Sequence, residues 1–134
     1  MKQIILCVLP VLILLSCNSN TNNTEDSKST VNNIDELIKN AENGNVEAQI
    51  EVGMLYYNGT DYVKKDCAEA SHWFRMAAEQ GSAEGQYRLG RMYDYGEGEE
   101  KNEEMALLLY RRAASQGHPY AQKALGIFYK EDLE

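Results

Sequence analysis

The sequence predicts an all-α fold, a short right-handed α-solenoid built from antiparallel helix pairs. One block of the chain occurs nearly three times. Its glycines and tyrosines recur at steps of 37 (90 − 53) and 36 (126 − 90) residues. They are Gly53 and Tyr56, Gly90 and Tyr93, and Gly126 and Tyr129. Helix-forming stretches alternate with short glycine-containing turns, and no stretch has the alternation of a strand. Repeats of this length are typical of stacked supersecondary units.

Residues 1–16 have the features of a secretory signal peptide and take no part in the fold. Lys2 gives a positive start, and an apolar run from Ile4 to Leu15 follows. The run is too short for a comfortable membrane span of about 20 residues. The next stretch, 18–33, is rich in Asn, Ser and Thr and has one apolar side chain, Val31. We therefore expect residues 17–33 to form a flexible polar tether.

From Ile34 onward the sequence predicts six helices, at residues 34–43, 46–57, 66–80, 83–94, 103–116 and 119–130. Their starts are indicated by residues that suit a helix N-terminus: Asn33 with Glu36, Asp66 with Glu69, Asn102, and Pro119. Their ends are indicated by glycines that can adopt a positive φ: Gly44, Gly59, Gly81, Gly96 and Gly117. The repeat domain then spans 34–134, with core copies near 46–81 and 83–117 and a half repeat at 119–130.

Small and large residues inside these helices indicate how the helices pack. Gly53, Gly90 and Gly126 fall inside helices, where glycine costs up to about 1 kcal/mol relative to alanine. We expect the backbone of a neighbouring helix to approach each of them closely. The large apolar residues at repeated positions are expected in the core: Trp73, Phe74, Leu109, Tyr110, Tyr56, Tyr93 and Tyr129.

These motifs resemble the Sel1-like repeat, a relative of the tetratricopeptide repeat. Both identities and spacing are kept in Gly85-Gln86-Tyr87-Arg88-Leu89-Gly90-Arg91-Met92-Tyr93 and in Ala113-Ala114-Ser115-Gln116-Gly117-His118-Pro119-Tyr120-Ala121-Gln122. The resemblance covers residues 34–130. Gly85 departs from it, because the other two copies have alanine at that position.

A second resemblance concerns Leu14-Leu15-Ser16-Cys17, which is similar to the lipobox of bacterial lipoproteins. It implies cleavage before Cys17, diacylglycerol on the Cys17 thiol and a further acyl chain, such as palmitate, on the new amino group. Several acyl chains anchor a protein almost permanently. The alternative is an ordinary cleaved signal with Cys17 as a free thiol. Because Asn18 follows Cys17 and no acidic cluster comes directly after it, we expect an envelope lipoprotein at the outer membrane, facing the periplasm.

Charge and cysteine content exclude several classes of function. The formal net charge is −8, and −9 (12 − 21) once Lys2 leaves with the signal, which argues against nucleic acid as a partner. Cys67 would be the one thiol left in the mature domain, so no disulfide or metal site is expected. We interpret Cys67 as a small filler residue, with a reactive thiol as the alternative. Neither His72 nor His118 belongs to a catalytic triad, and we expect no cofactor, no small-molecule substrate and no enzyme.

Resemblance to tetratricopeptide-like repeats assigns a concave groove to the first helix of each pair. The groove positions would hold Ile50, Met54, Tyr57, Tyr87, Arg91, Asp94, Tyr95, Tyr120, Lys123 and Lys130. Aromatic, Met and Arg side chains are favoured in protein interfaces. The alternative is that Ile50 and Tyr87 pack against the next helix. A second candidate surface is the acidic run Glu97, Glu99, Glu100, Glu103 and Glu104, which can also serve simply to complement a helix dipole.

The sequence therefore predicts a membrane-anchored, noncatalytic module that binds an unidentified protein or peptide through its groove. The acidic net charge weakly favours a partner with a basic patch. One alternative is an immunity or inhibitor protein that neutralises a secreted toxin, as the resemblance to Sel1-like lipoproteins implies. A less favoured alternative is a β-lactam-hydrolysing Sel1-like enzyme, since the paired cysteines of the cysteine-rich members are missing here.

Overall fold

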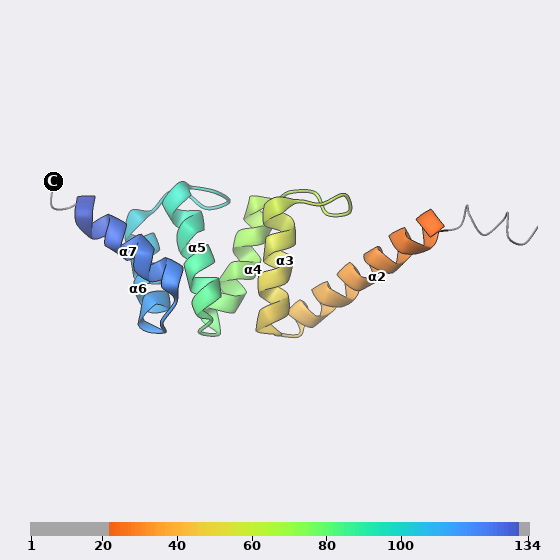
Figure 1. Ribbon diagram of the computed structural model, residues 1–134, viewed down its shortest axis with the longest axis horizontal. Helices are drawn as coiled ribbons and strands as arrows, with labels where there is room; N and C mark the ends of the chain where they lie inside the picture. Colours follow the sequence, from red (N-terminus) through yellow and green to blue (C-terminus); the bar gives the residue numbers. More distant parts are fainter. Residues whose placement is uncertain (1–21, 132–134) are drawn as a thin grey trace, which may run out of the picture. The chain divides into compact units, whose positions relative to one another are not determined.

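The computed structural model describes residues 22–131, and the surroundings of side chains over residues 27–127. The described residues form helices only, which confirms the all-α fold class (Figure 1). The helices are α2 (Asn22–Glu42), α3 (Val46–Asn58), α4 (Cys67–Glu79), α5 (Ala83–Tyr95), α6 (Glu103–Ser115) and α7 (Pro119–Glu131). The chain divides into two units, Met1–Glu36 and Leu37–Glu134, and the repeats belong to the second.

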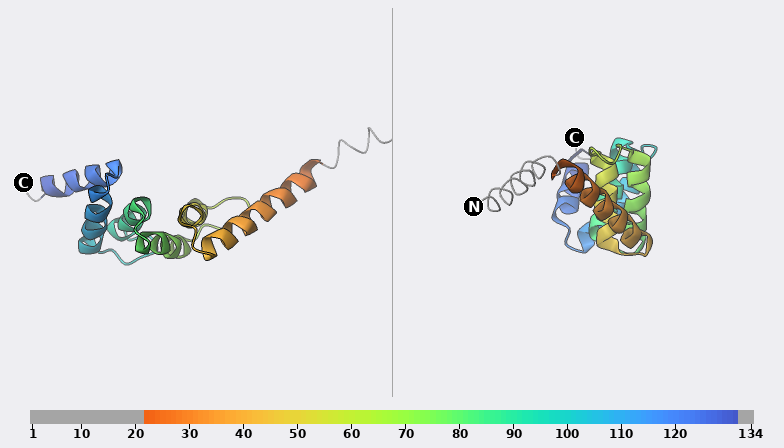
Figure 2. Two further views of the ribbon diagram at one scale, coloured as in Figure 1. Left: turned by 90° about the horizontal axis from the view of Figure 1, so that it is seen from below. Right: turned by 90° about the vertical axis from the view of Figure 1, so that its right-hand side faces the viewer.

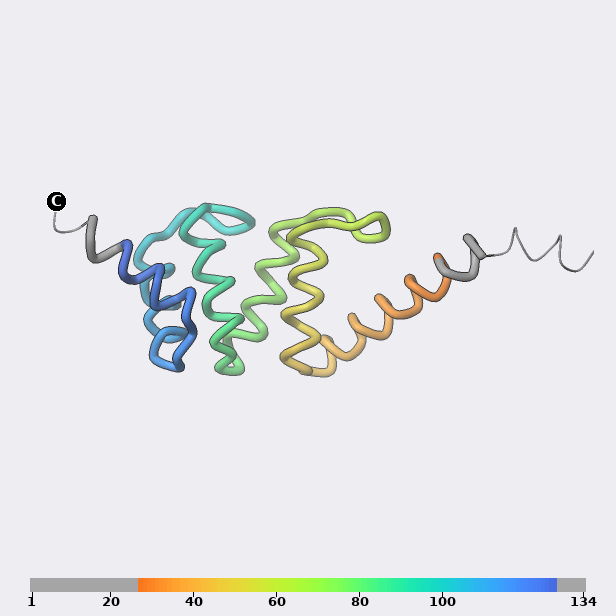
Figure 3. The backbone as a smooth tube through the Cα atoms, in the orientation of Figure 1, coloured from red at the N-terminus to blue at the C-terminus, as the bar shows by residue number. Residues whose placement is uncertain are grey.

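Within the second unit, each helix from α3 to α7 packs on the next one along the chain, as in a solenoid. Figure 3 traces this path, in which long loops after α3 and α5 alternate with tight turns after α4 and α6. In the left view of Figure 2, α3, α5 and α7 lie along one side of the stack, and α4 and α6 lie along the other. The first helices of the repeats thus share a side, as the resemblance implies.

Helix α2 is longer than the sequence predicts. The predicted start at Asn33 is wrong, because the helix already runs from Asn22, and residues 22–33 of the expected tether are helical here. Residues 28–33 are all exposed, so no burial in a core holds this part. Extending an existing helix costs much less than starting one, which explains how a polar stretch can continue a packed helix. The other tether residues, 17–21, and the signal peptide lie outside the described residues.

The remaining predicted helix starts are confirmed. The Asp66 carboxylate accepts the N–H groups of Ala68 and Glu69, both at 3.0 Å, and the Asn102 side chain accepts the N–H of Met105 at 3.0 Å. Helix α7 begins at Pro119, as predicted. These caps satisfy backbone donors that a helix leaves without partners.

Asp66 and Glu69 have the spacing of a capping box, in which the Glu69 side chain would accept the backbone N–H of Asp66. That bond does not form. The Glu69 carboxylate instead accepts the indole N–H of Trp73 at 3.1 Å, and the backbone N–H of Asp66 donates to the carbonyl of Tyr56 at 2.8 Å. The next repeat uses the same loop bond, from Asn102 N–H to the Tyr93 carbonyl at 2.9 Å. A carbonyl near the end of each first helix therefore fixes the start of the second helix. Glu69 is free to accept the indole N–H of Trp73.

The core lies between neighbouring helices in two adjoining clusters. One is formed around Phe74, with Ala70, Ala78, Leu89, Met92 and Leu109. The other is formed around Trp73, with Ala41, Ala48 and Val52. Tyr56 packs against both clusters, and Tyr110 is also fully buried. The expected core positions are thus confirmed, except Tyr129, whose side chain lies outside the described residues.

Two of the helix-interior glycines sit under aromatic rings. A Cβ at Gly53 would lie 2.5 Å from Cε1 of Phe74, and a Cβ at Gly90 would lie 2.9 Å from Cε1 of Tyr110. The expectation of a close backbone is wrong there, and holds instead at Gly85, where a Cβ would lie 2.8 Å from the backbone nitrogen of Ala78. Gly126 has nothing within 4 Å among the described residues.

Buried glutamine amides join the two helices of each repeat. Gln49 is fully buried, and its amide donates to the carbonyl of Ala41 at 3.0 Å while accepting from Gln80 at 2.8 Å. One repeat later, Gln86 accepts from Gln116 at 2.9 Å. A buried amide without partners would cost about 1–3 kcal/mol, so these bonds fix the position of α4 against α3 and of α6 against α5.

Candidate functional site

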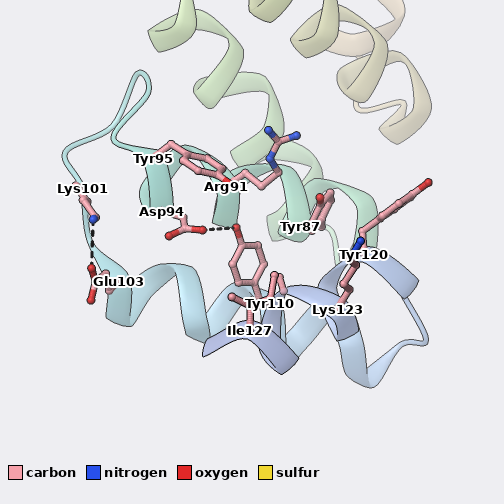
Figure 4. A pocket seen from close by; sticks show the side chains of 11 residues that line it. Tyr87, Arg91, Asp94, Tyr95, Lys101, Glu103, Tyr110, Tyr120, Lys123 and Ile127 are labelled. Atoms are coloured by element: carbon pink, nitrogen blue, oxygen red, sulfur yellow. Dashed lines mark hydrogen bonds and ion pairs between the residues drawn. The ribbon is translucent and has the colours of Figure 1, made fainter. Parts of the chain in front are cut away.

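The first helices of the second and third repeats face each other across a cleft of about 490 Å³ (Figure 4). Helix α5 supplies one wall and α7 the other, while Tyr110 of α6 lies between them. The lining residues are Tyr87, Arg91, Asp94, Tyr95, Lys101, Glu103, Tyr110, Tyr120, Lys123, Ala124 and Ile127. A cleft of this size, with aromatic and charged walls, is large enough for several side chains of a partner.

Aromatic rings from the two walls of the cleft stack against one another. The ring of Tyr87 is stacked on His118, with centroids 4.7 Å apart, and on Tyr120, with centroids 6.0 Å apart. Tyr110 lies 5.9 Å from Tyr87 in a tilted arrangement. Tyr87 is thereby held on three sides, whereas Tyr120 remains 64% exposed. Tyr120 is the ring that a ligand could cover, because the fold leaves most of its surface in water.

His118 fixes the start of α7 beside the cleft. Its Nδ1 accepts the N–H of Ala121 at 3.3 Å, and its Nε2 lies 2.6 Å from Oε2 of Glu84 on α5. Nδ1 must be unprotonated to accept, so Nε2 donates to Glu84. His118 therefore caps the first turn of α7.

The same carboxylate also pairs with the guanidinium of Arg88. Arg88 lies one turn along α5 from Glu84, and its Nε is 2.5 Å from Oε1, in ion-pair contact without a well-aligned hydrogen bond. Burial raises the pKa of Glu84, but the hydrogen bond from His118 and the charge of Arg88 outweigh it, so the net pKa lies below its ordinary value. Glu84 is therefore an ionised link between α5 and α7.

Tyr110 and Asp94 form the floor of the cleft. The Tyr110 hydroxyl donates to Oδ2 of Asp94 at 3.1 Å. Burial, together with the negative charge of Asp94, raises the pKa of Tyr110 far above its ordinary value. The phenol is therefore a neutral donor and does not act as a general acid or base near neutral pH.

The sequence-predicted groove residues separate into two sets. Six of them line the cleft: Tyr87, Arg91, Asp94, Tyr95, Tyr120 and Lys123. The other described ones, Ile50, Met54 and Tyr57 on α3, pack against the core cluster around Phe74. The Tyr57 hydroxyl also donates to Oε2 of Glu97 at 2.7 Å. The packing alternative, given for Ile50 and Tyr87, thus fits Ile50, and it also describes Met54 and Tyr57, for which it was not considered. Cys17 and the Lys130 side chain lie outside the described residues.

Several cleft residues were missed by sequence reasoning. Ala124 and Ile127 follow Tyr120 by four and seven positions, so helical spacing could have placed them on its face. Tyr110 was assigned to the core, and it is indeed buried, but its ring also forms the floor. Lys101 and Glu103 come from the α5–α6 loop and the start of α6, which no helical spacing relates to the groove.

The acidic run is partly built into the fold. Glu97 accepts from Tyr57, and Glu99 accepts from the Ser71 hydroxyl and pairs with Arg75. Gly98 between them has φ +71°, and a Cβ there would lie 2.1 Å from the carbonyl oxygen of Cys67. The loop is therefore pressed onto the start of α4. Glu103 and Glu104 lie in the first turn of α6, where negative charge complements the helix dipole.

Two kinds of feature are absent from the described residues, a membrane-spanning helix and a cluster of metal ligands. Residues 22–131 contain no helix that is both long and apolar enough to cross a membrane. The same part of the chain has no group of three or more His, Cys, Asp or Glu side chains arranged to hold a metal ion. Cys67 is half-buried at the start of α4, and His72 is exposed, with its ring edge-on to Trp73.

The stacked helix pairs and the cleft between first helices define a helical-repeat protein of the interaction type. The Sel1 repeat profile matches residues 46–82 and 83–118, more than half of the chain. The chain therefore belongs to the Sel1 repeat family, whose members generally act as noncatalytic scaffolds for protein–protein interaction.

Curated relatives share the repeats but are much longer. An uncharacterized protein of Neisseria meningitidis serogroup B is 36% identical over 90 residues, which cover 67% of this chain and 18% of the relative. The ERAD-associated E3 ubiquitin-protein ligase component HRD3A of Arabidopsis thaliana is 34% identical over 58 residues, covering 43% of this chain and 9% of the relative. The chain thus spans less than a fifth of the curated relatives it matches.

Solved structures agree with the fold. A protective antigen of uropathogenic Escherichia coli displaying an SLR fold superposes with a TM-score of 0.71 at 40% identity, covering 74% of this chain and 21% of that one. Helicobacter pylori cysteine rich protein B superposes with a TM-score of 0.64 at 27% identity, covering 82% of this chain and 77% of that one.

Proposed function

We propose that this protein is a lipid-anchored, noncatalytic module of the bacterial envelope that binds a partner protein through the cleft between α5 and α7. The observation that carries the proposal is the cleft itself, because six residues predicted to bind a partner surround one hollow of about 490 Å³. The Arabidopsis relative is a component of an E3 ubiquitin-protein ligase, which is consistent with a role as a part of protein assemblies.

The anchor part of the proposal rests on Cys17 and the motif before it. Metabolic labelling with an alkyne-bearing palmitate analogue should tag the wild-type protein, and the tagged protein should be found in the outer-membrane fraction. The Cys17→Ala variant should be neither labelled nor found in the membrane fraction. An unlabelled wild-type protein, or a Cys17→Ala protein that stays with the membrane, would contradict the anchor.

The binding part can be tested in living cells with a photo-crosslinking amino acid. Tyr120→p-benzoylphenylalanine places the probe in the cleft, and Tyr62→p-benzoylphenylalanine places it in the α3–α4 loop as a control. Both tyrosines are exposed, at 64% and 49%, so accessibility is matched. A covalent adduct of one defined mass at 120, absent at 62, is expected. Equal adducts at both positions, or none at 120, would contradict the cleft as the binding site.

Toxin neutralisation is a special case of the same proposal. A toxin partner would give the Tyr120 adduct, and purified protein would then inhibit that toxin in vitro. No observation among the described residues favours β-lactam hydrolysis. Incubation of the purified protein with a chromogenic β-lactam should therefore give no turnover.

A further inference from the structure

Two cations in the cleft have no carboxylate partner among the residues that the structure describes. Neither Arg91 nor Lys123 forms an ion pair within the described residues, although the whole chain carries a net charge of −8. In contrast, Arg75 on α4 pairs with Glu99, and Arg88 on α5 pairs with Glu84. An acidic protein thus keeps two unpaired cations on opposite walls of one cleft.

The carboxylates of the cleft are already engaged. Glu103 pairs with Lys101 at 3.2 Å, and Asp94 accepts the hydroxyl of Tyr110 at 3.1 Å. Lys101 offsets the charge of Glu103, whereas Asp94 keeps its formal negative charge, because the neutral phenol of Tyr110 only donates a hydrogen bond to it. Three cations and two carboxylates line the cleft, so their formal sum is +1 (3 − 2), which is opposite in sign to the net charge of the chain.

Arg91 is held in a position suited to an anion. Its guanidinium carbon lies 5.5 Å from the ring centroid of Tyr95, so the group is stacked on that ring. A stacked guanidinium can still direct two N–H groups at one carboxylate, which a lysine cannot do. In the view of Figure 4, Tyr87 lies between Arg91 and Lys123.

An exposed apolar strip runs beside these cations. Tyr120 and Ile127 are 64% and 53% exposed, and both line the cleft with Lys123. Positions 120, 123 and 127 differ by three and four residues, so they share one face of α7. A ligand side chain lying on this face would remove apolar surface from water at roughly 25 cal/mol per Å².

We propose that the cleft binds an acidic segment of the partner protein, in which an Asp or Glu side chain is followed within a few residues by an aromatic or large aliphatic one. The carboxylate pairs with Arg91 and Lys123, and the apolar side chain covers Tyr120 and Ile127. This inference rests on the proposed function. It replaces the weak expectation of a partner with a basic patch, which was based on net charge alone. A long polyanion such as nucleic acid does not fit, because two cations cannot offset repulsion by an acidic chain.

The proposal is tested by selecting peptides from a random library displayed on phage. The bait is the full lipidated chain in detergent micelles, as wild type and as the double variant Arg91→Glu, Lys123→Glu. The control bait carries the same charge change outside the cleft, Lys39→Glu with Lys64→Glu, both at exposed positions. Circular dichroism of all three baits checks that the fold is unchanged.

Wild type and control should select peptides with Asp or Glu near Phe, Tyr, Trp or Leu, whereas the Arg91→Glu, Lys123→Glu bait should select Lys or Arg instead. For a selected acidic peptide, Arg91→Ala should weaken binding about 10-fold, as for a charge-assisted hydrogen bond. Lys123→Ala should weaken it only about 2- to 5-fold, because the ammonium is exposed. Fluorescence anisotropy of the labelled peptide measures both, and added salt should weaken binding.

Two outcomes would overturn the proposal, and only one of them also overturns the proposed function. Wild-type selection of basic or uncharged peptides whose binding is lost on Tyr120→Ala overturns the acidic specificity but keeps the cleft as a protein-binding site. Peptides that bind equally well after Tyr120→Ala overturn both the acidic specificity and the proposed function.

Discussion

At the scale of single residues, the glycines show how one position serves different purposes in successive repeats. Gly53 and Gly90 are buried, and each leaves room for the aromatic ring of the following helix, Phe74 or Tyr110. Gly126 occupies the same repeat position but is exposed and has no neighbour among the described residues. The sequence alone shows three identical glycines, and only their surroundings separate them.

This difference predicts opposite effects of one substitution at equivalent positions. Gly90→Ala should destabilise the fold by about 1–3 kcal/mol, because the new methyl group would press on the Tyr110 ring, which the bond to Asp94 holds in place. Gly126→Ala should stabilise it by about 0.5–1 kcal/mol, because a helix-interior glycine is removed at an open site. Urea denaturation followed by circular dichroism measures both. A stabilising Gly90→Ala would contradict the ring contact.

At the scale of elements, α7 is held at its start by contacts from α5. Glu84 receives His118 from the turn before α7 and Arg88 from its own helix. The ring of His118 also stacks on Tyr87. The wall of the cleft that α7 forms is therefore positioned by a charged group on the opposite wall.

The lowered pKa of Glu84 makes part of this support dependent on pH. A carboxyl group whose pKa is lower in the folded state contributes stability above its ordinary pKa of 4.5, and that stability is lost as pH falls through the folded value. Denaturation from about pH 6 to about pH 3 should show a smaller loss in Glu84→Gln than in wild type. Glu47→Gln is the control, since Glu47 lies at the same repeat position on α3, is exposed and has no ion pair among the described residues. An identical loss in Glu84→Gln and wild type would contradict the link.

The sequence predicted those elements whose ends carry local signals. Asp66, Asn102 and Pro119 mark helix starts through their own chemistry, and all three are confirmed. The early start of α2 could not be predicted, because its polar residues 22–33 carry no apolar periodicity. The groove was assigned to the first helix of each pair by resemblance to tetratricopeptide-like repeats, and six of the assigned residues line the cleft between α5 and α7. The same assignment included α3, because a repeat position identifies a face without showing that the face is already packed on a core.

At the scale of the whole molecule, the second unit is a row in which each helix from α3 to α7 contacts its neighbours in sequence. In such a row, stability is a sum of terms between nearest neighbours. Helices α4 and α5 share the core cluster around Phe74, whereas α7 packs on α6 alone among the pairs with substantial contact. The middle of the row is therefore supported from both sides.

Native-state hydrogen exchange should reveal this gradient. We expect backbone amides of α4 and α5 to exchange slowest and those of α7 to exchange fastest among α3 to α7, because local opening of α7 breaks one interface and opening of α4 breaks two. Mass spectrometry of peptic fragments can assign the rates to helices. Equal protection of α4 and α7 would show that the row unfolds as one cooperative unit.

The repeated glutamine amides have a consequence for how such a protein can grow. Gln49 accepts from Gln80 within its repeat, and Gln86 accepts from Gln116 one unit later. Gln49 also donates to the carbonyl of Ala41 in the helix before it, and Gln122 makes the corresponding bond to Ala114. A copy of residues 46–82 inserted after Ser82 would carry its own pair of glutamines, so we expect that the array can be lengthened or shortened by whole units.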